Sequence, residues 1–133
     1  MARSPIEILA EMRTIALVGA SPKPSRPSNS VMRYLLDAGY RVLPVRPRVP
    51  EIHGVPCVAS LSEIDVPIDL VDVFRRTSAC PDVAREAVEV GAKAVWLQLG
   101  LVSPEARRIA ETAGLDYVEN ECTAIVHRWI PQR

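Results

Sequence analysis

The fold of this chain is decided by a stretch that begins Thr14-Ile-Ala-Leu-Val-Gly19 and continues Ala-Ser21-Pro-Lys23-Pro-Ser-Arg26-Pro-Ser28-Asn-Ser-Val31. Its first part is an uninterrupted apolar run, which is typical of a strand with both sheet faces covered. Gly19 then permits a sharp turn, and a helix pattern comes next. Because a helix N-terminus offers unpaired N–H groups and the positive end of a dipole, it stabilises an anion. The stretch therefore predicts a strand, a turn and a helix that together hold a phosphate group.

Strand and helix patterns alternate through the rest of the chain. A short helix is expected at about Pro5 to Met12, and strands are expected at Thr14–Val18, Arg41–Val45, Leu70–Phe74, Ala94–Leu99 and Asp116–Val118. Helical patterns connect these strands, and crossovers of this length imply parallel pairing with helices on both faces. We therefore expect an α/β fold: a Rossmann-like, five-stranded, mainly parallel sheet with helices on both faces, in one domain over residues 1–133.

The segment from Pro44 to Pro67 interrupts this rhythm with five prolines. We expect a loop here, with one extra short strand within Gly54–Val58. The pattern Ser60-x-x-Glu63 predicts a capping box at the start of a helical turn.

Composition narrows the classes of function. The 133 residues carry sixteen basic and sixteen acidic side chains, so no global field attracts nucleic acid or an anionic membrane. Apolar runs fall far short of the roughly 20 residues that span a bilayer, and we expect a cytoplasmic protein. The three cysteines, Cys57, Cys80 and Cys122, lack paired or zinc-type spacing. We expect reduced thiols, no metal, no nucleic acid and no membrane contact.

Ligands of such sheets bind beyond the carboxyl ends of the strands, and three of the five loops expected there are cationic. The first loop lacks the G-x-G-x-x-G pattern of dinucleotide sites, and no acid ends the second strand. Arg46 stands there instead, and it would attract a ribose phosphate. A Walker-type lysine is also missing, which disfavours ATP hydrolysis. The residues therefore leave NADP or coenzyme A (CoA) as the ligand.

Four motifs in order resemble the stand-alone CoA-binding domain family, whose members are similar to the nucleotide-binding domain of succinyl-CoA synthetase. The motifs are Val18-Gly-Ala-Ser-Pro-Lys-Pro-Ser-Arg-Pro-Ser28, Gly39-Tyr-Arg-Val-Leu-Pro-Val45, Val71-Asp-Val-Phe-Arg-Arg76 and Ala94-Val-Trp-Leu-Gln-Leu-Gly100. The resemblance runs from about Thr14 to Arg128. It implies a Rossmann-type domain that holds CoA or an acyl-CoA, a small-molecule nucleotide ligand.

The resemblance also implies which residues contact the ligand. The diphosphate would be contacted by Gly19, Ala20, Ser21, Lys23, Arg26 and Ser28. The adenosine would be bordered by Pro44, Val45, Arg46, Pro47 and Arg48. The groove would be lined by Phe74 and Arg75 and closed by Leu99 and Gly100. The chain departs from the family at Arg46, where asparagine is usual, and at Val126, where glutamate is usual.

Other side chains offer little catalytic chemistry. Cys122 borders the expected cleft, but a catalytic thiol needs a base, and His127 is reachable only if that segment is helical. We expect Arg75 or Arg76 to pair with Asp72 or Glu86. No catalytic residue is assigned, and the first hypothesis is a non-catalytic CoA or acyl-CoA binding protein. The alternatives are an NADP-linked oxidoreductase and a subunit that acts only with a protein partner.

Overall fold

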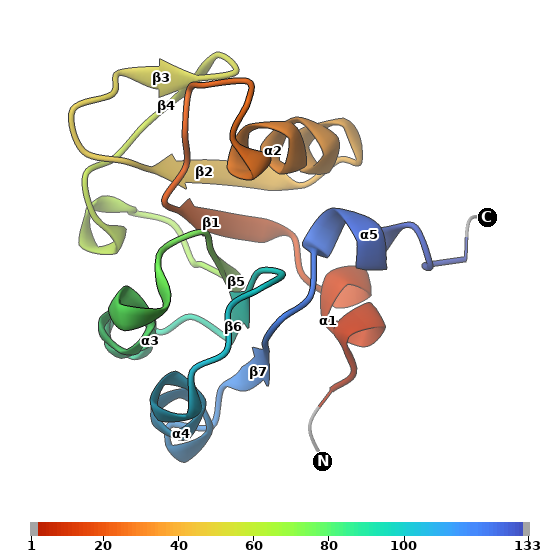
Figure 1. Ribbon diagram of the computed structural model, residues 1–133, viewed down its shortest axis with the longest axis vertical. Helices are drawn as coiled ribbons and strands as arrows, with labels where there is room; N and C mark the ends of the chain where they lie inside the picture. The colour runs from red at the N-terminus through yellow and green to blue at the C-terminus, as the bar shows by residue number, and fades with distance from the viewer. Residues whose placement is uncertain (1–2, 132–133) are drawn as a thin grey trace.

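The computed structural model describes residues 3–131, in which five strands form one sheet (Figure 1). These strands are β1 (Thr14–Val18), β2 (Arg41–Val45), β5 (Leu70–Val73), β6 (Ala94–Leu97) and β7 (Asp116–Val118). Their spatial order is β2-β1-β5-β6-β7, and every neighbouring pair is parallel. The order reverses between β1 and β5, which is the place where doubly wound sheets bind ligands. The predicted Rossmann-like α/β fold is confirmed.

Helices cover both faces of the sheet, as Figure 1 shows. One face is covered by α1 (Pro5–Glu11), α2 (Pro27–Asp37) and α5 (Thr123–His127). The other is covered by α3 (Cys80–Glu89) and α4 (Pro104–Thr112). Side chains alternate along a strand, so Ile15 and Leu17 of β1 join the first core and Ala16 and Val18 join the second. Two separate cores thus fix the sheet between its helices.

Two strands end earlier than expected. Strand β5 ends at Val73 and β6 at Leu97, although Phe74 N still donates to Val18 O (2.8 Å) and Gln98 N to Val73 O (3.3 Å). The chain turns away after these bonds. As a result, Phe74 and Leu99 lie in the loops beyond the sheet edge and not within the strands.

The proline-rich segment forms a small hairpin, with β3 (Glu51–Ile52) antiparallel to β4 (Val55–Pro56). One short strand was expected here, and there are two. The predicted capping box at Ser60 is wrong: the Ser60 side chain caps nothing and lies 2.9 Å from Ser62 Oγ, before a three-residue 3₁₀ turn, η1 (Leu61–Glu63). The turn is too short to contain an α-helical first turn whose N–H groups a capping box would satisfy.

The part of the chain that the structure describes contains no helix both long and apolar enough to traverse a bilayer.

Candidate functional site

A cavity of about 590 Å³ opens at the carboxyl ends of β1, β5 and β6. The loops after β1 and β5 both line it, so it lies at the point where the strand order reverses. This is the position at which open α/β sheets bind their ligands. The cavity therefore coincides with the site that the fold itself favours.

Gly19 begins the turn that forms one wall. Its φ is +86°, a conformation that disfavours residues with a Cβ atom. A Cβ atom built at this position would lie 2.9 Å from the carbonyl carbon of Phe74, closer than a real Cβ approaches backbone. Gly19 N also donates to Val45 O at 3.2 Å. Glycine is thus required here because the backbones of three neighbouring strands converge.

The turn after Gly19 is held by its own hydrogen bonds. Lys23 N donates to Ser21 Oγ (3.2 Å) and Arg26 N to Lys23 O (3.0 Å). The buried side chain of Asn29, in the first turn of α2, donates from Nδ2 to Ser21 O (2.9 Å). These contacts fix the turn against the start of the helix. Little further ordering is needed when an anion binds.

The start of α2 faces the same space. Pro27 and Ser28 line the cavity, and Arg26 occupies the N-cap position without a side-chain capping bond. Pro27 has no N–H to satisfy, and its ring favours the helical φ. The positive end of the dipole of this 11-residue helix is therefore directed at the cavity.

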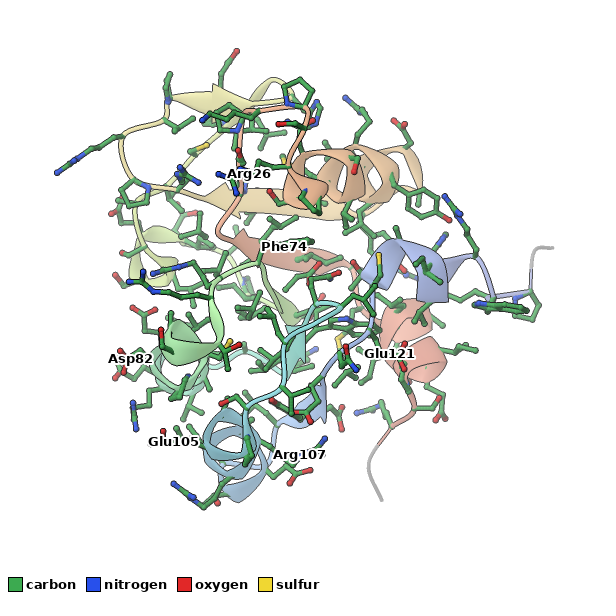
Figure 2. All side chains as sticks on the ribbon, viewed as in Figure 1. Arg26, Phe74, Asp82, Glu105, Arg107 and Glu121 are labelled. Carbon is green, nitrogen blue, oxygen red and sulfur yellow. The ribbon has the colours of Figure 1, made fainter. Side chains whose placement is uncertain are left out.

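Four cations line the cavity: Lys23, Arg26, Arg46 and Arg75. Among the described residues, none of the four forms an ion pair, and no carboxylate is part of the lining. Figure 2 shows Arg26 near the start of α2 and Phe74 beyond the end of β5, while Glu105 and Arg107 lie on α4, far from both. The cavity is consequently electropositive, and its charges are available to a ligand.

The expected ion pair between Arg75 or Arg76 and an acid is wrong for both acids named. Asp72 is fully buried and faces Gln98 and Thr123. Glu86 forms no ion pair within residues 3–131. The arginines lie beyond the end of β5 and are exposed, whereas Asp72 is within the strand and points into the core. Nearness in sequence therefore does not bring these opposite charges together in space.

Arg46 is the first of the two positions at which a departure from the resembled family was expected. Its Nη1 donates to Ala20 O at 3.1 Å, so the side chain reaches from the end of β2 to the turn after β1. Val126, the second departure, belongs to α5, is 8% exposed and packs in the core that α5 shares with α1 and α2. The first change adds a cation to the site, and the second places an apolar side chain within the fold.

The lining on the β6 and β7 side of the sheet is apolar. Leu99 and Leu101 follow β6, Cys122 precedes α5 and Ile125 lies in it, and Phe74, after β5, joins them. Leu99 and Ile125 are exposed to 66% and 49%. A ligand that is anionic at one end and apolar at the other matches this division.

A buried polar network lies below this apolar end. Gln98 Nε2 donates to Asp72 Oδ1 and to Thr123 Oγ1 (3.0 Å), and Thr123 Oγ1 donates to Asp72 Oδ2 (3.1 Å). Burial raises the pKa of Asp72 to about 7, although both hydrogen bonds oppose the rise. The network ties β5, the end of β6 and the start of α5 together.

Nine of the fifteen predicted ligand-contacting residues line this cavity: Gly19, Ser21, Lys23, Arg26, Ser28, Arg46, Phe74, Arg75 and Leu99. Val45 and Pro47 line a second cavity of about 340 Å³, which shares Gly19, Arg46 and Arg75 with the first. Ala20 and Pro44 are buried behind the lining, and Arg48 and Gly100 are exposed outside both cavities. The structure thus brings most of the predicted set together around two adjoining spaces.

Eight lining residues were not among those predicted: Pro22, Pro27, Val31, Val49, Gln98, Leu101, Cys122 and Ile125. Pro22 and Pro27 lie within the first motif, and Gln98 and Leu101 flank the predicted Leu99 and Gly100. Cys122 and Ile125 come after β7, whose loop was expected at the same sheet edge. For Gln98, Leu101, Cys122 and Ile125, a place in the segment after β6 or β7 was the sequence signal that could have predicted their position in the lining.

Catalytic thiol chemistry finds no support in the geometry around Cys122. The segment after Cys122 is helical, which was the condition for His127 to act as its base. His127 Nδ1, however, lies 2.8 Å from Tyr34 Oη and so pairs with that hydroxyl. The three cysteines are free, and burial raises the pKa of the Cys57 and Cys80 thiols. Within residues 3–131, no group of three or more His, Cys, Asp or Glu side chains is placed to bind a metal ion.

Comparisons with known proteins match the chain over nearly its whole length. It is similar to the uncharacterised protein YneT of Bacillus subtilis, with 43% identity over 121 residues, covering 91% of this chain and 90% of YneT. A solved structure of a hypothetical protein from Pyrococcus horikoshii is 42% identical with a TM-score of 0.90, covering 93% of this chain and 87% of that one. An ADP-forming acetate–CoA ligase of Archaeoglobus fulgidus is 24% identical over 132 residues, which are 92% of this chain and 19% of the ligase.

The family comparison agrees with these relatives. The family model described as a CoA binding domain matches residues 13–128, which include β1 to β7 and all of the cavity lining. The chain is therefore a member of the CoA-binding domain family.

Proposed function

We propose that this chain binds CoA or a short acyl-CoA, with the diphosphate held by the turn from Gly19 to Ser28 and the start of α2. The observation that carries the proposal is the cavity at the strand-order reversal, lined by four cations and no carboxylate among the described residues. A diphosphate is the part of CoA that such a site stabilises best, through charge-assisted hydrogen bonds and the helix dipole.

The two adjoining cavities match the remaining parts of the ligand. The second cavity, beside Val45 and Pro47 at the end of β2, would take the adenosine. The apolar end of the first, around Phe74, Leu101 and Ile125, would take the pantetheine arm and a short acyl group. Arg46 borders both spaces and is placed to contact the ribose phosphate.

The role proposed for the protein is binding without catalysis. Cys122 is the one nucleophilic thiol of the described lining, and His127, the base considered for it, is engaged by Tyr34. Asp72 is the one buried acid among the described residues, and its two oxygens accept hydrogen bonds from Gln98 and Thr123. The site is equipped to recognise charge and shape.

Isothermal titration tests this proposal with CoA and NADP as separate ligands. We expect heat with CoA at micromolar or tighter affinity, and weaker binding of dephospho-CoA because Arg46 then loses its phosphate partner. Clear binding of NADP with none of CoA would contradict the proposal and favour an NADP-linked oxidoreductase.

A second candidate function is that of a subunit in a CoA ligase. It is favoured by the relationship to the ADP-forming acetate–CoA ligase, of which this chain spans 19% of the length. The chain would then supply CoA to a partner that carries the remaining domains. Mixing it with that ligase lacking its own CoA-binding domain should restore acetyl-CoA formation; an inactive mixture, with both proteins folded, would rule this function out.

A further inference from the structure

Gln98 is the one carboxamide in the described lining of the main cavity. It comes directly after β6 and is 5% exposed, so its side chain is nearly enclosed while still forming part of the wall. Glutamine is seldom buried unless its amide is hydrogen-bonded. The nitrogen and the oxygen of this amide differ in the partners that they find.

The nitrogen of the amide is fully used. Gln98 Nε2 donates hydrogen bonds to Asp72 Oδ1 and to Thr123 Oγ1, and the threonine hydroxyl in turn donates a hydrogen bond to Asp72 Oδ2. Above about pH 7 Asp72 is ionised and can only accept hydrogen bonds, so at the pH 8 of the test below the donor end of the amide has to face it. The carboxylate thereby fixes which way the amide is turned.

The oxygen of the amide is left over. Within residues 3–131, no group donates a hydrogen bond to Gln98 Oε1. Every fully buried side-chain nitrogen or oxygen of these residues has a hydrogen-bond partner, so the unpartnered Oε1 is accessible from outside the core. Oε1 is therefore the atom by which Gln98 reaches the cavity. Its neighbours in the lining, Leu99, Leu101 and Cys122, offer it no strong side-chain donor.

We propose that Gln98 is a ligand-binding residue whose Oε1 accepts a hydrogen bond from an amide N–H of the pantetheine arm. The inference rests on the proposed function, because it assigns the arm of the same ligand to the apolar end of the same cavity. An acceptor among apolar side chains selects a ligand segment that is mostly apolar but carries an N–H donor. An ionised phosphate can only accept hydrogen bonds, so it cannot pair with Gln98 Oε1, which is itself an acceptor.

Asp72 and Thr123 act in this proposal as positioning residues. They hold the amide with its acceptor outward before the ligand arrives, which is how a fixed polar group contributes to specificity. A ligand without the matching donor would leave Oε1 desolvated and unpaired, and such a loss lowers affinity more than a missing apolar contact does.

The test compares CoA with adenosine 3′-phosphate 5′-diphosphate, which has the anionic end but lacks the pantetheine arm. Isothermal titration is carried out at pH 8 with the wild type and with Gln98→Met, which keeps the length of the side chain and removes the acceptor. We expect Gln98→Met to weaken CoA binding about 3- to 10-fold, as one neutral hydrogen bond would, and to leave the truncated ligand unchanged.

A structural role for Gln98 would give another pattern, because a distorted site weakens both ligands together. An unchanged ratio of the two affinities in Gln98→Met would therefore overturn the inference while leaving CoA binding in place. Wild-type protein that binds neither ligand would instead overturn the proposed function.

A second measurement uses wild-type protein alone and does not depend on the folding of a variant. CoA analogues in which each amide N–H of the arm is replaced in turn by an ester oxygen keep the shape and lose one donor. We expect one of these analogues to bind about 3- to 10-fold more weakly than CoA. Equal affinity for CoA and every ester analogue would refute the hydrogen bond to Gln98.

Discussion

Removing the two cations of the first turn should weaken CoA binding far more than it affects folding. Lys23 and Arg26 both line the main cavity, are exposed to solvent and form no ion pair in the described chain. The double variant Lys23→Ala, Arg26→Ala therefore deletes contacts to the ligand and leaves no buried charge behind. The cores on both sides of the sheet are unaffected.

The size of the effect depends on the exposure of these side chains. A hydrogen bond to a charged group contributes about 1.5–3 kcal/mol, and solvent screening places these two contacts at the low end. Two contacts of about 1.5 kcal/mol amount to about 3 kcal/mol, which is about 150-fold in the dissociation constant. Because exposed charges are screened by salt, the loss should shrink as the ionic strength is raised from about 0.05 M to about 0.5 M.

Isothermal titration with CoA measures this effect, and thermal melting followed by circular dichroism checks the fold. Arg108→Ala is the matched control, because Arg108 is an exposed cation of α4 on the opposite face of the sheet from α2. We expect the control to bind CoA as the wild type does. A folded double variant that binds CoA within about twofold of the wild type would refute the electropositive turn as the diphosphate site.

Three further predictions concern the residues that build the site. Gly19→Ala should destabilise the fold by about 2–4 kcal/mol in urea unfolding, since about 1–2 kcal/mol of left-handed strain adds to the overlap with the Phe74 carbonyl. Gly91→Ala is the control, because Gly91 has φ +75° but open space around its Cβ position, so this variant should lose stability through backbone strain alone. Equal losses of stability in the two variants would contradict the close approach of Gly19 to Phe74. Folded protein keeps the Asp72 proton up to about pH 7 while unfolded chain releases it near 3.8, so wild-type stability from this group falls as pH rises between these values. Asp72→Asn should therefore gain stability over the wild type, by up to about 4 kcal/mol at pH 8 and by little near pH 4, in denaturant titrations at both pH values; a constant difference would disprove the raised pKa. Arg46→Ala should bring the affinities for CoA and dephospho-CoA together in competition titrations, and a preserved preference would place the ribose phosphate elsewhere.

The sheet was predictable because its signals are local. Continuous apolar runs such as Ile15–Val18, separated by helical spacing with glycine stops, permit few arrangements other than parallel strands with crossover helices. The expected bounds of β1, β2 and β7 agree with the structure at both ends. Strands β5 and β6 are shorter because their ends depend on how far the neighbouring strand continues, which no local pattern records.

Capping was harder to predict because the same pattern occurs in two contexts. Ser60-x-x-Glu63 precedes only a 3₁₀ turn, whereas Ser4-x-x-Glu7 forms a full capping box at α1: Ser4 N donates to Glu7 Oε1 (2.9 Å) and Glu7 N to Ser4 Oγ (3.2 Å). The two serines differ in the length of the helical segment that follows them. Ser4 precedes a helix of seven residues, whereas Ser60 precedes a single short turn that ends before Pro67.

The part of the site that is continuous in sequence was predictable, whereas the part built from distant segments was missed. The turn from Gly19 to Ser28 carries its charges, its glycine and its helix start in one run. The network of Asp72, Gln98 and Thr123 joins three elements that are distant in sequence, and only the order of the strands brings them together. Asp72 was expected to meet an arginine, since sequence proximity says nothing about which face a buried strand residue occupies.

A crystal structure of the protein with bound CoA would show directly whether the turn from Gly19 to Ser28 holds the diphosphate. We predict that the diphosphate oxygens lie within hydrogen-bond distance of the backbone of the turn and of Lys23 or Arg26, with the pantetheine arm passing Phe74 toward Ile125. CoA bound away from that turn, or a main cavity left empty at saturating CoA, would contradict this placement of the ligand.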